Sequence, residues 1–316
     1  MIKFNELFHE GLRAIEMAND HISLTTIPLL GGKIVTLINK KSGFNFIYKN
    51  KNVKNRLWAY DSDFSKSNAS GIDECFPTVA PSEYREFPWN NIKIPDHGEI
   101  WTQELKTLTK DSVLDQTVHG VRFPYVFNRK IKIDNNKIYF TYNIINLGSH
   151  DFKYIWSFHP ILKLLPGTRI NVNENSDMYI DFSTNSRFDL KIKKYKWPVA
   201  FDNSGSEIDF SVINDVDSGN AEKIYLDRII SGKVDLIYPE QNEKMSFKFN
   251  STVLKHCGIW INRKGWPIDG YKLDSLAIEP CNCLSDRFED SLKSGSFGIV
   301  KANSSTIWEI ELAIID

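Results

Sequence analysis

The stretch RKIKIDNNKIYFTYNI, residues 129–144, decides the fold. Ile131 and Ile133 precede the turn-forming sequence Asp-Asn-Asn, and apolar residues then alternate with more polar ones from Ile138 to Ile144. An apolar residue at every second position is typical of an antiparallel strand with one buried face. The stretch therefore predicts a β-hairpin that packs one face against a core.

Similar short alternating runs occur along most of the chain. A Lys-Lys-Ser-Gly turn joins two of them within residues 33–48, and residues 306–314 form a candidate closing strand with Trp308 and Leu312 on its apolar face. Aromatic residues make up 13% of the chain, enough to fill the broad interior between two sheets. Helical patterns are sparse, and no repeat or linker divides the sequence. We predict one all-β domain over residues 1–316, a large antiparallel two-sheet sandwich.

The charge balance excludes some classes of partner. With 39 basic and 40 acidic residues the net charge is −1, so no bulk field attracts nucleic acid or an anionic membrane. The first 20 residues lack the apolar core of a secretory signal, and no apolar run of about 18 residues occurs, which favours a cytoplasmic location. The cysteines are too few for a disulfide scaffold, and Cys281 and Cys283 lack the C-x-x-C spacing. We expect four reduced thiols, at Cys75, Cys257, Cys281 and Cys283.

Residues 61–95 lack sustained alternation and are rich in turn formers, so we expect a long loop there, and loops of that length are usually functional or mobile. His97 follows this segment, with Asp96, Glu99 and Trp101 close by in the sequence. The adjacent glycine would let the backbone approach a ligand closely. His97 is therefore a candidate site residue.

Two more candidates occur where apolar runs meet a proline. His159 ends the aromatic run Trp-Ser-Phe-His before Pro160, which we expect to end the strand, since proline cannot continue a central strand. Glu279 follows an apolar run and precedes Pro280, and a carboxylate partly withdrawn from water becomes a useful base near neutral pH. The alternatives are a capping histidine bonded to the backbone and a glutamate in an ion pair.

Other chemistries find less support. Two histidines and a glutamate are a familiar metal-ligand set, but their separations match no local metal-binding motif and HExxH is absent, so we expect no metal and no cofactor. Cys75 and Cys281 stand in no recognisable nucleophile context. No glycine-rich phosphate loop occurs, and Gly31 and Gly32 are better interpreted as a turn before a strand.

The order of short motifs resembles the aldose 1-epimerase, or galactose mutarotase-like, superfamily over roughly residues 20–316. The motifs are the Gly31-Gly32 turn, GIDECFPTVAP (71–81), DHGEIW (96–101), WSFHP (156–160), LAIEP (276–280) and WEIEL (308–312). The resemblance implies a β-supersandwich with a sugar site in a groove on one sheet. It also implies a cofactor-independent enzyme that interconverts the anomers of a free aldose.

Roles for individual residues follow from this resemblance. Glu279 matches the base that takes the proton of the C1 hydroxyl, and His159 matches the acid that, as imidazolium, protonates the ring oxygen. His97 matches the histidine that contacts the sugar. The substrate-binding candidates are Trp101, Trp156 and Trp260, which could stack on the sugar, Asp73 and Glu74, which could accept its hydroxyls, and Glu222, Lys223 and Arg85.

The sequence also departs from the family pattern. An acidic residue expected between the second histidine and the base is replaced by Glu222-Lys223, which motivates a non-catalytic sugar-binding or regulatory protein as the alternative. An acidic or phosphorylated sugar would require arginines at the groove, for which Arg56, Arg85 and Arg263 are the candidates. In each case the partner is a small-molecule carbohydrate, and the chain is a monomer or a homodimer.

Overall fold

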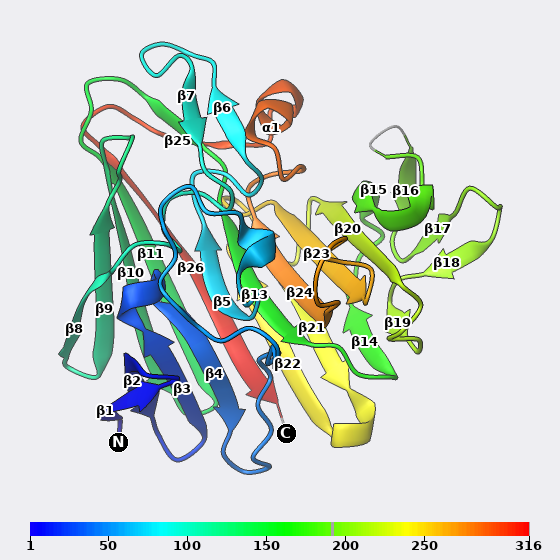
Figure 1. The fold of residues 1–316 in the computed structure, drawn as a ribbon, viewed down its shortest axis with the longest axis horizontal. Coiled ribbons are helices and arrows are strands. Elements are labelled where there is room, and N and C mark those ends of the chain that lie inside the picture. Colours follow the sequence, from blue (N-terminus) through cyan, green and yellow to red (C-terminus); the bar gives the residue numbers. More distant parts are fainter. Residues whose placement is uncertain (191–192, 316) are drawn as a thin grey trace.

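The computed structural model describes residues 1–190 and 193–315, which form two large antiparallel sheets, with both chain termini near the same end (Figure 1). The first sheet, called sheet A here, has thirteen strands within these residues. Their order is β1 (Lys3–His9), β2 (Leu12–Ala18), β3 (Ile22–Ile27), β4 (Lys33–Asn39), β5 (Gly71–Cys75), β13 (Ser157–Lys163), β24 (Asp274–Cys281), β23 (His256–Arg263), β20 (Asn220–Asp227), β15 (Asp177–Ser183), β16 (Lys194–Lys196), β17 (Val199–Phe201) and β18 (Glu207–Asp209).

The second sheet, sheet B, has nine strands in the same described ranges. Their order is β19 (Val212–Ile213), β14 (Thr168–Asn171), β21 (Lys233–Tyr238), β22 (Glu243–Phe249), β26 (Ser305–Ile315), β11 (Lys137–Asn146), β10 (Tyr125–Asp134), β9 (Val113–His119) and β8 (Lys106–Lys110). The smaller elements are the pairs β6 (Ser82–Tyr84) with β7 (Ile92–Ile94) and β12 (Phe152–Tyr154) with β25 (Gly298–Val300), the helix α1 (Phe288–Ser294), and the 3₁₀ turns η1 (Pro28–Leu30), η2 (Phe64–Lys66), η3 (Thr184–Ser186) and η4 (Pro239–Gln241). None of the helices in the described residues is long and apolar enough to cross a membrane.

The hairpin predicted from residues 129–144 is confirmed. Strands β10 and β11 pair in antiparallel register, with Ile131 opposite Phe140 and Ile133 opposite Ile138 on the buried face. The predicted closing strand is also confirmed: β26 lies between β22 and β11 and buries Trp308. All-β architecture with large antiparallel sheets therefore follows from the alternation in the sequence.

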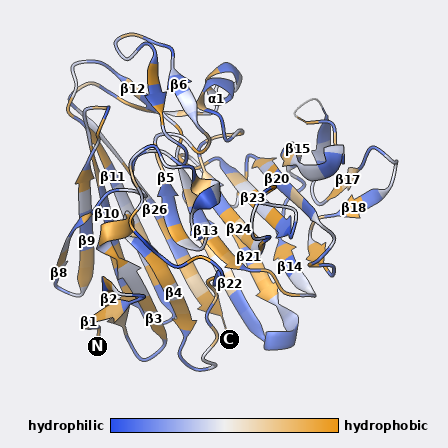
Figure 2. Ribbon diagram, viewed as in Figure 1, coloured by the Kyte–Doolittle hydropathy of each residue, from blue (hydrophilic) through white to orange (hydrophobic). Residues whose placement is uncertain are grey.

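The core lies between the two sheets. Alternate residues of β10 and β11 are buried, as expected where one face of a strand packs inward. Figure 2 shows apolar residues concentrated along the strands, whereas the turn between β21 and β22 is hydrophilic. One large apolar cluster includes residues of both sheets, such as Phe158 and Ile278 of sheet A and Phe140 and Ile310 of sheet B.

A buried polar network crosses this core. The Arg129 guanidinium of β10 donates to the Glu74 carboxylate of β5 at 2.8 Å and also to the side chain of Gln116 and the carbonyl of Gly32. Tyr142 donates its hydroxyl to the same Glu74 oxygen at 2.9 Å. Because Arg129 and Glu74 are both completely buried, each needs the other to compensate its charge.

Two expectations about secondary structure are wrong. Residues 71–75, expected within a loop, form β5, a central strand of sheet A. The sequence did not indicate this strand because its two acidic residues suggested an exposed segment. Both acidic residues are instead buried and form ion pairs. Pro160, expected to end its strand, lies inside β13 opposite Ile72 of β5.

Candidate functional site

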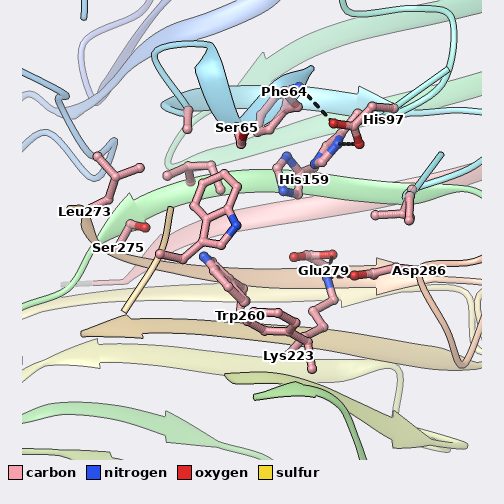
Figure 3. Close-up of a pocket in the computed structure, with 17 residues that line it drawn as sticks. Phe64, Ser65, His97, His159, Lys223, Trp260, Leu273, Ser275, Glu279 and Asp286 are labelled. Atoms are coloured by element: carbon pink, nitrogen blue, oxygen red, sulfur yellow. Dashed lines mark hydrogen bonds and ion pairs between the residues drawn. The ribbon is translucent and has the colours of Figure 1, made fainter. Parts of the chain in front are cut away.

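A cavity of about 270 Å³ opens on the face of sheet A formed by β13, β24, β23 and β20, beneath the loop that carries η2 (Figure 3). His97, His159 and Glu279 all line it, although they are far apart in the sequence. The remaining lining residues are Phe64, Ser65, Ala69, Val79, Ala80, Asp96, Ile161, Phe182, Lys223, Trp260, Trp266, Leu273, Ser275 and Asp286.

Strand alternation directs His159 and Glu279 to the cavity. The β13–β24 register pairs Ser157 with Cys281 and Leu162 with Leu276, which places His159 opposite Glu279. Among the described residues, no further ladder pair joins these strands between those two points. Pro160 lies between Ser157 and Leu162 and has no N–H to donate, which is consistent with the missing hydrogen bonds between β13 and β24.

The Glu279 carboxylate is part of a buried charge cluster. Lys223 of β20 forms an ion pair with its Oε2, the Ser157 hydroxyl donates to Oε2 at 3.1 Å, and Asp286 lies 3.6 Å from the Lys223 ammonium. Glu279 and Lys223 are both almost completely buried. One ammonium therefore serves two carboxylates, and the second carboxylate in turn accepts a hydrogen bond from the Tyr225 hydroxyl at 2.6 Å.

Burial and neighbouring charges shift the ionisation of this cluster. Burial raises the pKa of Glu279, and the attraction of Lys223 opposes that rise. Burial alone would lower the pKa of Lys223, but Asp286 and Glu279 raise it overall. Lys223 is thus firmly protonated, and Glu279 accepts a proton more readily than an exposed glutamate does.

His97 is positioned by its loop. Its backbone is left-handed, with φ of 58°, and its N–H donates to the Val79 carbonyl at 2.6 Å. The following Gly98 packs against the Phe76 backbone so closely that a Cβ would lie 1.9 Å from the Phe76 carbonyl oxygen. The imidazole stacks on Phe64 at 3.8 Å between ring centroids.

Asp96 holds the His97 ring from the other side. Its Oδ1 lies 2.9 Å from His97 Nδ1, and its Oδ2 accepts the Phe64 N–H at 2.8 Å. Burial would raise the pKa of Asp96, but His97 and these hydrogen bonds lower it overall. The contact with a carboxylate leaves Nε2 of His97 as the ring nitrogen available to a ligand.

His159 lies beside His97, with 4.9 Å between ring centroids. Burial and the nearby positive charges of His97, Lys223 and Lys33 hold the pKa of His159 well below its usual range. In the free protein His159 is therefore a neutral imidazole, whereas the sequence-based expectation was an imidazolium. Its Nδ1 is buried and has no hydrogen-bond partner among the described residues.

Aromatic side chains form one wall of the cavity. Trp260 of β23 is partly exposed and makes an edge contact with Trp266 at 5.9 Å and a tilted contact with Phe182 at 5.8 Å between centroids. Indole faces and edges of this kind suit the C–H face of a sugar ring. Of the three predicted tryptophans, Trp260 lines the cavity.

The other two tryptophans lie elsewhere. Trp101 is buried behind Phe64, with 5.3 Å between their centroids, and donates its indole N–H to the Asp96 carbonyl at 2.8 Å. It supports the cavity wall without lining it. Trp156, which directly precedes β13, is fully buried in the core between the sheets, where it packs on Tyr142 and Trp308.

Of the predicted polar residues, some also line the cavity and others lie elsewhere. Lys223 lines the cavity, whereas Glu222, the preceding residue of the strand, binds Arg187 and Arg263 on the opposite face. Asp73 faces the same side as His159 but is buried in an ion pair with Lys33 at 3.1 Å. Glu74 belongs to the inter-sheet network, and Arg85 is exposed beside another surface groove.

No arginine of the described residues lines this cavity. Arg56 is exposed and stacks on Trp58 at 4.1 Å, and Arg263 is buried with Glu222. The cationic side chain at the cavity is Lys223, which already faces two carboxylates. The cavity therefore lacks the guanidinium groups expected for an acidic or phosphorylated sugar.

The structure adds residues that the sequence did not single out. Phe64 and Asp286 line the cavity, and Ser157 contacts Glu279 from β13. Phe64 and Asp286 come from irregular segments with no periodic signal, so only the folded chain brings them to the site. Ser157 could have been found by counting two residues back from His159, since strand neighbours at that spacing share a face.

A family described as a domain of unknown function, DUF5107, matches residues 5–102, less than a third of the chain. Among curated proteins, none matches this chain.

A galactose mutarotase-like protein from Clostridium acetobutylicum is similar with a TM-score of 0.69 at 14% identity, covering 100% of this chain and 99% of that one. A candidate aldose 1-epimerase from Escherichia coli K12 gives 0.67 at 14% identity, with the same coverage. A galactose mutarotase related enzyme from Lactobacillus acidophilus gives 0.65 at 15% identity, covering 96% and 97%. The architecture of this chain, from end to end, is therefore the galactose mutarotase-like β-sandwich.

Proposed function

We propose that this protein is a cofactor-independent aldose 1-epimerase acting on a free aldose. The observation that carries the proposal is that His97, His159 and Glu279 line one small cavity from three distant segments of the chain. Anomer exchange needs a base and an acid on the same sugar ring, and these side chains supply both. The cavity of about 270 Å³ lies just below the range of about 300–1,000 Å³ typical of drug-sized ligands, so it suits a small one.

Glu279 is the base in this proposal. As carboxylate it takes the proton of the C1 hydroxyl, while the ring oxygen is protonated and the bond between C1 and the ring oxygen breaks. Rotation about the C1–C2 bond and the reverse proton transfers close the ring as the other anomer. The ion pair with Lys223 favours the carboxylate form, and the raised pKa of Glu279 keeps it basic enough to accept the proton.

The two histidines act together on the ring oxygen. Their centroids are 4.9 Å apart, so both can reach the same substrate atom. The Asp96 carboxylate lies 2.9 Å from Nδ1 of His97 and leaves Nε2 of this ring for the sugar, so we assign the proton transfer to His97. His159, neutral in the free protein, donates a hydrogen bond to the same oxygen. These roles differ from the sequence-based expectation, in which His159 supplied the proton.

Anomer exchange on a panel of free aldoses, followed by polarimetry or saturation-transfer NMR, tests the enzyme directly. We expect acceleration of at least one aldose, and loss of that acceleration in Glu279→Gln. If no aldose is exchanged faster than in buffer and Glu279→Gln changes nothing, the proposed activity is wrong. Since the described part of the chain contributes no arginine to the cavity lining, we also expect phosphorylated sugars to be poorer substrates than free ones.

One contact favours a second candidate, a sugar-binding protein without turnover. The ammonium of Lys223 lies directly against Glu279 Oε2, and a carboxylate held this way is a weaker base. Calorimetric titration with the same aldoses separates the two functions. Saturable binding without exchange supports the binding protein, and the absence of binding rejects both.

A further inference from the structure

A cysteine belongs to the same face of sheet A as the two histidines. Cys75 of β5 lies opposite Ser157 of β13, and Asp73 of β5 lies opposite His159, so Cys75 and His159 project to the same side. One ligand atom each from Cys75, His97 and His159 lies within 4.8 Å of the other two. Cys75 is not among the residues that line the cavity, and it has no part in the sugar chemistry proposed above.

Two features of the histidines suit a metal ion. The Nδ1 of His97 faces the Asp96 carboxylate at 2.9 Å, which is the usual outer-shell arrangement of a metal-bound histidine and leaves Nε2 free. His159 carries a buried Nδ1 with no hydrogen-bond partner among the described residues. A buried ring nitrogen without a partner is costly, and a bound cation would satisfy it.

We propose that Cys75, His97 and His159 form a binding site for a transition metal ion of the Zn²⁺ class, with its fourth coordination position open to the cavity. One thiolate and two imidazoles are donors that zinc accepts readily. Bonds of about 2.0–2.3 Å in tetrahedral geometry place ligand atoms roughly 3.3–3.8 Å apart, so no pair of ligand atoms needs to close by more than about 1.5 Å.

The charges around the site are compatible with this cation. The carboxylates of Asp73, Glu279 and Asp286 interact electrostatically with the Cys75 thiol, as does the ammonium of Lys223. Burial raises the pKa of the Cys75 thiol well above its ordinary value, so binding must expel the thiol proton.

Metal and sugar would compete for the same side chains. If the proposed function is correct, a metal bound to His97 and His159 removes both groups from the ring oxygen of the sugar. The metal would then act as an inhibitor that a saturating aldose relieves. This consequence rests on the proposed function, whereas metal binding itself does not.

Titration of the whole, reduced protein with Co²⁺ tests the site without any activity assay. We expect one equivalent to bind and to give a thiolate-to-cobalt charge-transfer band in the near ultraviolet. Cys75→Ser should lose the band, while Cys257→Ser, which removes another completely buried thiol of sheet A, should retain it. No band in the wild-type protein, or the same band in Cys75→Ser, would overturn the proposal.

Zn²⁺ provides the second measurement. We expect it to displace Co²⁺ and to raise the midpoint of thermal unfolding of the wild-type protein and of Cys257→Ser, because a ligand of the folded state stabilises it. His97→Gln should lose at least about tenfold in Zn²⁺ affinity, as expected when one of three ligands is removed. An unchanged affinity in this variant would contradict the assigned ligand set even if Cys75→Ser fails to fold.

Discussion

Gly258 lies directly opposite Glu279 in the ladder between β23 and β24, and its missing side chain leaves room for Glu279 to meet Lys223. A Cβ at Gly258 would lie 3.1 Å from Glu279 Oε2 and 3.3 Å from Lys223 Cε. The backbone of Gly258 is not left-handed, so glycine is needed here for space rather than for conformation. The residue opposite the proposed base thus controls its geometry.

Gly258→Ala should reduce anomer exchange while the protein still folds. The added methyl group is closer to Glu279 and Lys223 than ordinary van der Waals contact allows, so these side chains must shift by a few tenths of an ångström, and a misplaced reacting group slows the reaction. We expect kcat to fall by at least about tenfold. Circular dichroism and thermal unfolding check that the sheet is intact, and wild-type kcat in a folded variant would show that this contact does not position the base.

Lys223→Met should move the acid limb of the pH–rate profile to higher pH. Burial raises the pKa of Glu279, and Lys223 opposes that rise, so removal of the ammonium lets the pKa rise further. The carboxylate form, which the reaction needs, then appears only at higher pH. Lys163→Met is the matched control, because Lys163 lies on β13 but outside the cavity lining. If the acid limb of the pH–rate profile does not move in Lys223→Met, Lys223 does not control the ionisation of Glu279 in the reaction.

Alternation along the strands made the fold predictable from the sequence, but not every strand. The hairpin of β10 and β11 alternates cleanly because one of its faces is buried and the other is partly or fully exposed. Strand β5 does not, since all five of its residues are buried and its acids, Asp73 and Glu74, are paired with Lys33 and Arg129. Such partners come from distant segments, so the sequence around β5 indicates a polar loop.

The sequence predicted the candidate site only at residues that belong to a recognisable motif. His159 and Glu279 stand at motif positions, and both line the cavity. Adjacent strand residues such as Glu222 and Lys223 point to opposite faces of the sheet. The sequence alone does not show which of the two residues faces the cavity. The same ambiguity applies to Trp156, which lies in the core, whereas the next residue, Ser157, contacts Glu279 at the cavity.

Trp260→Ala should weaken sugar binding without unfolding the protein. Trp260 is partly exposed on the cavity wall, so its removal takes away a stacking surface and leaves the core intact. We expect a rise in KM of about tenfold with a smaller effect on kcat. Trp156→Ala provides the contrast, because this fully buried side chain should cost about 3–5 kcal/mol of stability when removed. Equal KM values for Trp260→Ala and wild type would remove Trp260 from the site.

Arg129→Met should destabilise the protein in a pH-dependent way. Burial raises the pKa of Glu74 to about 7 in spite of the opposing attraction of Arg129, and loss of the guanidinium raises it further. A carboxyl whose folded pKa lies above its unfolded value binds its proton more tightly in the folded state. Its contribution to stability is therefore present at low pH and lost as the pH rises through the folded pKa.

The loss of stability in Arg129→Met should accordingly be largest at neutral to alkaline pH, where an unpaired buried carboxylate costs about 3–5 kcal/mol. The loss should be smaller near about pH 5, where Glu74 is protonated. Urea unfolding at both pH values measures the difference. Arg122→Met is the control: its ion pair with Asp61 is partly exposed, and its loss should cost less than about 1 kcal/mol at either pH. A deficit in Arg129→Met that is equal at both pH values would show that Glu74 does not take up a proton in the variant.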